Sequence, residues 1–369
     1  MTTPIRTAVI GYGLAGKVFH CPFVHAVPGL ELTAIVVSNP DRAAQAHEHY
    51  PYAPIVAKYE TVLADPAIDL VVVATPNESH FDIAKAVLLA GKHVVIDKPI
   101  TTSAAEAREL IDLAAKQGKI LAPYHNRRFD TDFLTLSKLI AANTLGRITE
   151  VISSFDRYRP LVRPNTWKES GFLNGLLYDL GPHLIDQALA HFGAPARLTA
   201  FDTVIRDTTD IDDFMQVTLE YDMNLENGET RTLFYHCHPS MLAADPNPRL
   251  RVHGTHGSYT KQGLDPQEAA LIKGTRPPEL GSAEPWLPEP ESAWGTLTLG
   301  TKITEPVELS RNPYPSVTGD YRLYYANVRD AINGTADLIV PTEDGYRVLH
   351  LLDLARQSAT ERRTLDVTF

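Results

Sequence analysis

Hydrophobic residues in the first 125 positions gather in short, almost continuous runs that alternate with stretches of helical periodicity. The runs cover residues 7–11, 32–37, 69–74, 93–97 and 120–124. Apolar runs of this length are typical of parallel strands buried on both faces, and their alternation with helices is typical of βαβ units. The pattern therefore predicts an open, doubly wound parallel sheet.

The helices between these runs are best marked after Ser103. Its hydroxyl can cap a helix, and Glu106 stands three residues later, where a capping box places its carboxylate. Apolar residues that share one helical face follow at Ala107, Leu110, Ile111 and Ala114. Gly118 then stops the pattern, so we expect a helix between Ser103 and Gly118.

From Arg147 onwards the pattern changes to longer alternating stretches of apolar and polar residues. They cover 147–158, 197–205, 213–221, 230–236 and 249–253, and helical patterns follow at 321–333 and 343–358. Strict alternation is typical of antiparallel sheets that are buried on one face. We therefore expect two domains, residues 1–122 and 123–369, the second an α+β domain with a large, mostly antiparallel open sheet.

A proline-rich stretch interrupts the second half. Six prolines lie between Leu264 and Trp294. This density predicts an irregular surface excursion, a lid or an interface arm, in place of regular elements.

Length and charge narrow the class of protein. The chain has 369 residues, more than the roughly 250–300 that one core supports, and 45 acidic against 34 basic residues. The resulting charge of −11 argues against nucleic acid as a partner. The start resembles a strand and no signal peptide, and the most apolar run, 69–76, is too short to span a membrane, so we expect a cytoplasmic protein without a membrane partner. Two cysteines, Cys21 and Cys237, suit reduced structural thiols.

A glycine motif directly follows the first predicted strand and opens a helix. It comprises Gly11, Tyr12, Gly13, Leu14, Ala15 and Gly16. In this setting the first glycine permits a tight turn, the second lets the backbone approach a pyrophosphate, and the third allows close packing of helix on strand. The motif therefore predicts a Rossmann dinucleotide-binding domain, with a structural turn as the alternative.

The end of the second predicted strand bears on the choice of dinucleotide. Ser38 and Asn39 are neutral where NAD-preferring sites place a carboxylate, and Arg42 can neutralise a 2′-phosphate. Asp41 argues for NAD if it turns towards the ribose. We expect NADP to be preferred over NAD, while the same residues also suit a plain turn and helix cap.

Two further strand ends carry polar residues at the edge where open α/β sheets bind ligands. Thr75-Pro76-Asn77 ends the third long strand and Asp97-Lys98-Pro99 ends the next. A lysine at the tip of a buried strand can donate a hydrogen bond to a substrate oxygen and stabilise an alkoxide. Lys98 is therefore a candidate catalytic residue, with a surface lysine in a turn as the alternative.

A second candidate cluster lies in the second half. Asp179, His183 and Asp186 are spaced so that one helix would place them on one face, provided that Pro182 lies in its first turn. His183 could then move a proton near neutral pH while a carboxylate fixes its tautomer. An incidental histidine beside a capping aspartate is the alternative. We expect no metal, since no further ligand cluster supports zinc.

Together these motifs resemble the Gfo/Idh/MocA family of glucose-fructose oxidoreductase and inositol dehydrogenase relatives, over essentially the whole chain. The matching stretches are the glycine loop 11–16, Thr75-Pro76-Asn77-Glu78-Ser79-His80, Asp97-Lys98-Pro99 in place of the family's Glu-Lys-Pro, and Tyr178-Asp179-Leu180-Gly181-Pro182-His183-Leu184-Ile185-Asp186. The resemblance implies that Lys98, Asp179 and His183 form the catalytic group. It also implies cofactor contacts from Thr75, Pro76, Asn77, His80, Asp97 and Lys98.

Other stretches resemble one branch of this family, the one that includes NADP-dependent scyllo-inositol dehydrogenases. They are Gly16-Lys17-Val18-Phe19-His20-Cys21-Pro22, His125-Asn126-Arg127-Arg128-Phe129-Asp130 and Trp167. Two departures stand out, because Asp97 replaces the usual glutamate and Asn174-Gly175-Leu176 stands where many members have consecutive glycines.

The resemblance implies hydride transfer between a nicotinamide and a hydroxyl or carbonyl carbon of a polyol, inositol or sugar-like substrate. Candidate substrate contacts, besides His183, are Asn126, Arg128, Tyr158, Trp167 and Lys168. It also implies a homodimer or homotetramer that assembles through the C-terminal sheet. The alternatives are a dinucleotide-binding sensor without turnover and a glycosidase with tightly bound NAD.

Overall fold

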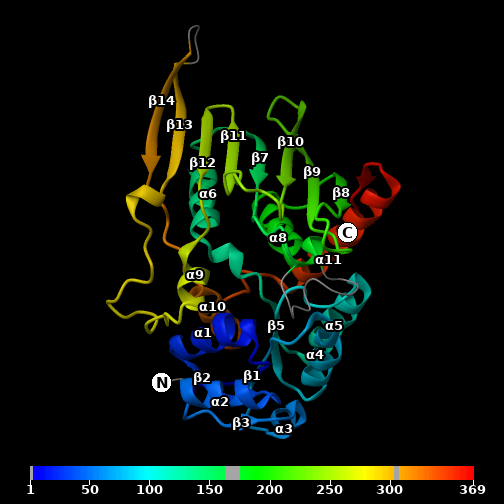
Figure 1. Ribbon diagram of the computed structural model, residues 1–369, viewed down its shortest axis with the longest axis vertical. Coiled ribbons are helices and arrows are strands. Elements are labelled where there is room, and N and C mark those ends of the chain that lie inside the picture. Colours follow the sequence, from blue (N-terminus) through cyan, green and yellow to red (C-terminus); the bar gives the residue numbers. More distant parts are fainter. Residues whose placement is uncertain (1–2, 163–174, 303–306) are drawn as a thin grey trace. The chain divides into compact units, whose positions relative to one another are not determined.

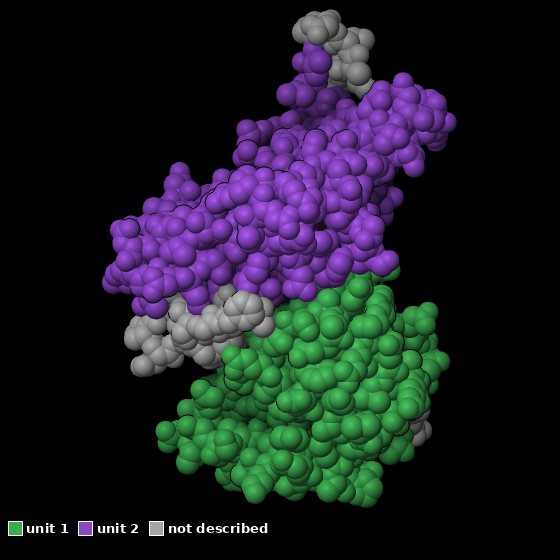
Figure 2. All heavy atoms as spheres, turned by 90° about the vertical axis from the view of Figure 1, so that its right-hand side faces the viewer, with its two compact units in different colours: residues 1–129, 266–287, 320–349 green, residues 130–265, 288–319, 350–369 purple. Residues whose placement is uncertain are grey.

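The structure, a computed structural model, describes residues 3–162, 175–302 and 307–369. The chain forms two compact units, which Figure 2 distinguishes by colour. Unit 1 comprises residues 1–129, 266–287 and 320–349, and unit 2 comprises residues 130–265, 288–319 and 350–369. Each unit is therefore assembled from separate stretches of sequence. The boundary between residues 122 and 123 that we expect from sequence stays a prediction.

Unit 1 is built on a six-stranded sheet in the order β3-β2-β1-β4-β5-β6. Figure 1 labels β1, β2, β3 and β5 of this sheet. Its strands are β1 (Ile5–Ile10), β2 (Leu30–Val36), β3 (Ile55–Val56), β4 (Leu70–Val73), β5 (His93–Ile96) and β6 (Leu121–Pro123). Every neighbouring pair is parallel. This is the order of a doubly wound nucleotide-binding fold, so the predicted fold class of the first part is confirmed.

Helices connect these strands. They are α1 (Cys21–Ala26), α2 (Pro40–His49), α3 (Tyr59–Ala64), α4 (His80–Leu89) and α5 (Ala104–Gln117). The predicted cap of α5 is present, since Ser103 Oγ accepts the Glu106 N–H and Gly118 ends the helix with a φ of +61°. The chain runs from β1 to β3 in one direction along the sheet and from β4 to β6 in the other, so right-handed crossovers place α1 and α2 on one face and α4 and α5 on the opposite face.

Late segments of the chain complete the core of unit 1. Leu271 of α9 (Pro266–Ile272), Trp286, and Tyr321 and Tyr324 beside or in α10 (Arg322–Ile332) are buried in the same cluster as the first strands. The irregular stretch expected between Leu264 and Trp294 is found over residues 273–290, which contain no helix or strand, but the expectation missed α9 and the burial of Leu271 and Trp286. Pro266 starts a helix, where its missing N–H costs nothing, and Leu280 and Leu287 pack partly buried against the same core as Leu271 and Trp286.

Unit 2 is built on a nine-stranded sheet in the order β14-β13-β12-β11-β7-β10-β9-β8-β15. Its strands are β7 (Ile148–Ser153), β8 (Arg197–Thr203), β9 (Phe214–Asn224), β10 (Thr230–Cys237), β11 (Leu250–Gly254), β12 (Gly257–Lys261), β13 (Gly295–Lys302), β14 (Glu308–Tyr314) and β15 (Leu365–Asp366). All neighbours are antiparallel except β7 and β10, which are parallel. The predicted mostly antiparallel sheet is confirmed.

One face of this sheet is covered by helices and the other is open. The helices of unit 2 are α6 (Thr131–Ala141), α7 (Leu176–Asp179), α8 (Gly181–Phe192) and the second part of α11 (Thr342–Glu361). In β9, Met215, Val217 and Leu219 are buried while the residues between them are half-buried. Within the described ranges of both units, no helix combines the length and apolarity that crossing a membrane requires.

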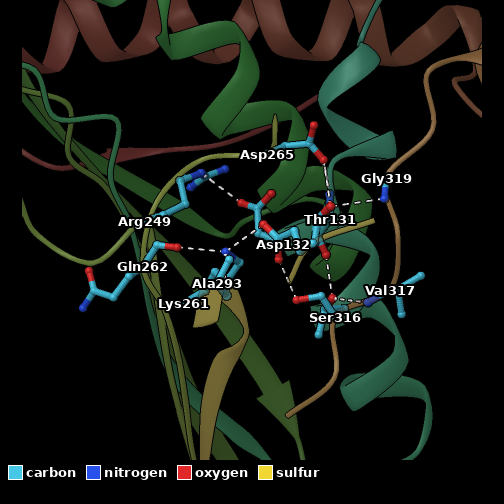
Figure 3. A network of polar contacts seen from close by, with 12 residues as sticks. Thr131, Asp132, Arg249, Lys261, Gln262, Asp265, Ala293, Ser316, Val317 and Gly319 are labelled. Carbon is cyan, nitrogen blue, oxygen red and sulfur yellow. Dashed lines mark hydrogen bonds and ion pairs between the residues drawn. The ribbon is translucent and has the colours of Figure 1, made fainter. Parts of the chain in front are cut away.

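A buried polar network holds the start of α6 to the strands of unit 2 (Figure 3). Arg249, directly before β11, forms an ion pair with Asp132 at 2.9 Å, and both side chains are 2 % exposed. Lys261 of β12 pairs in the same way with Glu289 at 3.0 Å. Thr131 donates its hydroxyl to Asp265 at 2.8 Å. Each of these charges has an opposite charge as its partner, and Arg249 and Lys261 also donate hydrogen bonds, which lowers the cost of burying them.

Candidate active site

The glycine turn of unit 1 has the geometry that a dinucleotide requires. Gly11 follows β1 with a φ of +102°, and a Cβ there would overlap the carbonyl oxygen of Ala74. A Cβ on Gly16 would overlap the carbonyl oxygen of Gly11, so only glycine lets the helix pack this closely on the strand. The helix begins at Leu14, and Ala15–His20 is π-helical, a geometry frequent at functional sites.

The middle of this turn is open. A Cβ on Gly13 would have only one neighbour within 4 Å, the guanidinium of Arg42 at 3.8 Å. Leu14 is exposed, whereas the ring of Tyr12 is buried and its hydroxyl contacts His49 Nδ1 at 2.7 Å. The turn therefore leaves a cradle of backbone at a helix N-terminus, which fits the pyrophosphate of a dinucleotide.

The residues that follow β2 include one neighbour of the glycine turn, Arg42. Asn39 accepts the Arg42 N–H at 3.0 Å and caps α2, so its side chain has the structural role of a helix cap. Ser38 and the side chain of Arg42 are exposed. Arg42 thus lies beside the glycine turn, whereas Asp41 is in the first turn of α2.

His80 joins the two polar strand ends. It is fully buried, and its Nδ1 and Nε2 each lie 2.8 Å from a carbonyl oxygen, of Pro99 and of Thr75 respectively. Ser79 donates its hydroxyl to Thr75 Oγ1 at 2.7 Å. The buried ring of His80 thus connects the loop 75–77 to the loop 97–99, with one ring nitrogen in contact with each loop.

Asp97 and Lys98 lie at the end of β5. Asp97 Oδ1 accepts the backbone N–H of Lys98 at 2.8 Å, and Oδ2 lies 3.8 Å from His20 Nε2. Burial works to raise the pKa of Asp97, but the contact with His20 and the charges of Lys98 and His80 outweigh it and lower that pKa to about 2. Asp97 is therefore ionised, and its negative charge lies beside Lys98.

In unit 2, Asp179 and His183 lie on two consecutive helices. Asp179 is the last residue of α7, while α8 begins at Gly181 with Pro182 in its first turn. The expectation of one helix carrying both residues is therefore wrong, and the reason is Pro182 itself, which is tolerated only because the helix starts just before it. His183 is buried in the first turn of α8.

The segment that follows β7 supplies neighbours that the sequence pattern does not reveal. Arg157 Nη1 lies 3.7 Å from Asp179 Oδ2, and the ring of Phe155 lies 6.4 Å from that of His183. These contacts join positions more than twenty residues apart, outside any helical or strand period. Arg157 thus holds a positive charge beside the Asp179 carboxylate.

The start of α7 depends on Asp212. Its carboxylate accepts the Leu177 N–H at 2.9 Å, and a Cβ on Gly175, whose φ is +90°, would clash with that carboxylate. Burial, and then the nearby Asp212 carboxyl, raise the pKa of Asp202 to about 7. Asp202 and Asp212 thus form an acidic pair behind the helix that carries Asp179.

We expect this pair to make stability depend on pH. The pKa of Asp202 is raised in the folded chain, so its contribution is complete below the unfolded value of 3.8 and is lost as the pH rises to about 7. The melting temperature of Asp202→Asn should therefore fall less between weakly acidic and neutral pH than that of the wild type. At neutral pH it should be higher than that of the wild type. Asp245→Asn, at an exposed position, is the control. Parallel pH profiles for wild type and Asp202→Asn would contradict the prediction.

The candidate substrate contacts differ in their surroundings. Arg128 is buried in unit 1 and pairs with Asp344 at 2.7 Å, and Asn126 is also buried there. Tyr158 is 61 % exposed in unit 2. Trp167 and Lys168 lie outside the described residues. Among the residues described, no group of three or more His, Cys, Asp or Glu side chains could hold a metal ion. The substrate assignments stay predictions.

Two family models match nearly the whole chain. Residues 5–125 match the model described as "Oxidoreductase family, NAD-binding Rossmann fold". Residues 137–367 match the model described as "Oxidoreductase family, C-terminal alpha/beta domain". Both models belong to the Gfo/Idh/MocA group, so the comparison agrees with the motifs described above.

Individual relatives match over the same length. The chain is 40% identical to the oxidoreductase YdgJ of Escherichia coli over 365 residues, which are 99% of both chains. It is 36% identical to the scyllo-inositol 2-dehydrogenase (NADP(+)) IolW of Bacillus subtilis, over 98% of this chain and 95% of the other. The structure of the oxidoreductase yvaA from Bacillus subtilis has a TM-score of 0.89, 34% identity and 99% coverage of both chains.

Proposed function

The chain belongs to the Gfo/Idh/MocA oxidoreductase family, and from this membership we propose that it transfers hydride between NADP and a hydroxyl-bearing carbon of a small polyhydroxylated substrate. The proposed substrate class is inositols and related polyols or sugars. The similarity to a scyllo-inositol 2-dehydrogenase along the whole chain supports this class.

The observation that carries the proposal is the arrangement of the strand ends in unit 1. The open glycine turn after β1 fits a pyrophosphate, and the loops after β4 and β5 are tied together by His80 at the same carboxyl edge of the sheet. Ligands of doubly wound folds bind at this edge. The position of Lys98 directly after β5, at this edge, supports its assignment as a polar group beside a bound nicotinamide.

We assign three roles to side chains of this chain. A bound nicotinamide supplies the hydride acceptor for oxidation and the donor for reduction. Lys98 donates a hydrogen bond to the substrate oxygen and stabilises negative charge on it. His183 takes the hydroxyl proton during oxidation and returns it during reduction, and Asp179 orients it. The carbon loses hydride as its oxygen loses the proton, which leaves a carbonyl product.

The preference for NADP rests on Arg42. Its guanidinium is the single neighbour of the open position at Gly13, and no carboxylate ends β2. We expect Arg42→Ala to weaken NADP binding by about ten- to a hundredfold, the loss of one charge-assisted contact, and NAD binding by no more than about twofold. Fluorescence titration of each dinucleotide measures this. Lys116→Ala, exposed on α5, is the control, and equal weakening of both dinucleotides would contradict the assignment.

The activity itself is tested by the absorbance of reduced nicotinamide. Purified protein is mixed with NADP or NAD and a panel of inositols, aldoses and their keto forms. Turnover with a polyol or sugar and NADP supports the proposal. Dinucleotide binding without turnover on any member of the panel would instead favour a sensor, and sugar cleavage without net absorbance change would favour a glycosidase.

Assembly through the C-terminal sheet is part of the proposal. The open face of that sheet exposes large apolar side chains, among them Phe201 on β8 and Phe234 on β10, which are 45% and 40% exposed. Exposed aromatic residues on one face are typical of an interface. Light scattering should give a dimer or tetramer, and a mass of 40.7 kDa at all concentrations would contradict this.

A further inference from the structure

His20 lies behind the candidate active site of unit 1 and has no role in the proposal so far. It ends the π-helical turns and is fully buried. Its Nδ1 lies 2.7 Å from the hydroxyl of Tyr325 in α10, and its Nε2 lies 3.8 Å from Asp97 Oδ2. The ring of Tyr124 packs against it, with the centroids 4.3 Å apart. His20 therefore joins α10 to the end of β5.

The neighbours of His20 determine which ring nitrogen bears the proton. Burial raises the pKa of Tyr325 well above its ordinary value, so its phenol keeps a proton to donate. Asp97 is ionised and can only accept. The arrangement in which both contacts are favourable has Tyr325 O–H donating to Nδ1 and Nε2–H directed at Asp97. With the opposite tautomer, a nitrogen lone pair would face the carboxylate.

Asp97 in turn fixes the backbone of Lys98. Its Oδ1 accepts the Lys98 N–H at 2.8 Å, while Oδ2 faces His20. We propose that Tyr325 and His20 are positioning residues that hold the Asp97 carboxylate in this orientation, and thereby fix the strand end from which Lys98 acts. This inference rests on the proposed function of Lys98. Residues that orient the ligands of metal sites affect activity about ten- to a hundredfold, and we expect an effect of the same order here.

The tautomer of His20 is a test that needs no turnover. In the full chain labelled with ¹⁵N-histidine, long-range ¹H–¹⁵N correlation reports which nitrogen of each ring is protonated, and the His20 signal is the one lost in His20→Gln. We expect the proton on Nε2 in the wild type. In Tyr325→Phe it should stay there, because Asp97 still accepts it, while the chemical shift of Nδ1 should change because Nδ1 loses the hydroxyl that donates to it. A ring with its proton on Nδ1 alone would overturn the proposal, and so would an unchanged Nδ1 chemical shift in Tyr325→Phe. His25, whose Nδ1 also lies 2.7 Å from a tyrosine hydroxyl, that of Tyr52, should be unchanged in Tyr325→Phe.

Kinetics test the effect on Lys98. His20→Met keeps similar volume without an N–H, whereas the amide of His20→Gln can place an N–H where Nε2 lies. We expect His20→Met to lower kcat about ten- to a hundredfold, while KM and the dinucleotide Kd stay within about twofold of the wild type. His20→Gln should recover about half or more of the loss in kcat on a logarithmic scale. His25→Met, on the next helix α1, is the matched control and should leave kcat unchanged.

The outcomes separate this proposal from the proposed function. Equal loss of kcat in both His20 variants, with an equal fall in melting temperature, would show that His20 has only a packing role and would overturn the proposal. A normal kcat in His20→Met would also overturn the proposal. If the wild-type chain turns over no substrate, the proposed function fails, while the tautomer of His20 still decides the arrangement of the positioning residues.

Discussion

Lys98→Met should lower kcat by about 10²–10³, the loss measured when one donor to a developing oxyanion is removed. Lys98 follows Asp97 directly at the end of β5, where the backbone is fixed by the Asp97 carboxylate. Methionine keeps the length of the side chain but can neither donate a hydrogen bond nor carry charge. Steady-state rates of nicotinamide reduction, with dinucleotide Kd measured separately by fluorescence, separate a loss of chemistry from a loss of binding.

A lysine on the same unit serves as the control for this change. Lys85 pairs with Glu109 between α4 and α5, and both side chains are exposed. Lys85→Met removes the same charge and should leave kcat unchanged. Near-normal turnover in Lys98→Met would remove Lys98 from the catalytic group and with it the mechanism proposed above.

Arg249→Met should lower the free energy of unfolding by about 3–5 kcal/mol, because it leaves the Asp132 carboxylate buried without its ion pair. Arg249 also donates to Ser153 at 2.6 Å and lies over the ring of Phe155, so the substitution removes several contacts of one side chain. Urea unfolding followed by circular dichroism measures the loss.

Two further variants test whether the buried charge is the cause. In the double variant Arg249→Met with Asp132→Leu, no charge is left unpaired, so the loss should be clearly smaller than the sum of the two single losses. Arg231→Ala removes one partner of the exposed pair with Glu229 and should cost no more than about 0.5 kcal/mol. A loss below about 1 kcal/mol for Arg249→Met would contradict the importance of the network.

The sequence predicted the elements whose pattern is local. Continuous apolar runs identified five strands of the parallel sheet, but not β3, which has only two residues. Alternation identified β7 to β11 approximately, whereas β12 and β13 start with glycine and contain mainly small or hydroxyl-bearing residues between few apolar ones. Strands with so few apolar positions lack the period on which such a prediction depends.

The same limit applies to the site. The glycine turn was predictable, because its function depends on spacing within six residues and on the strand before it. Arg157 beside Asp179, and Tyr325 beside His20, are brought together by the fold across 22 and 305 positions. A single sequence contains no signal for such pairs, although the stretch 16–22 that contains His20 stood out by resemblance.

The discontinuity of unit 1 has a consequence for how the protein is made. Its first 129 residues leave the ribosome long before residues 320–349, which supply Tyr321, Tyr324 and Tyr325 to the same core. At about 5–20 residues per second the interval is roughly 10–40 s. During that time the nascent dinucleotide-binding sheet must keep apolar surface uncovered, so this stage of synthesis is where chaperones would be most needed.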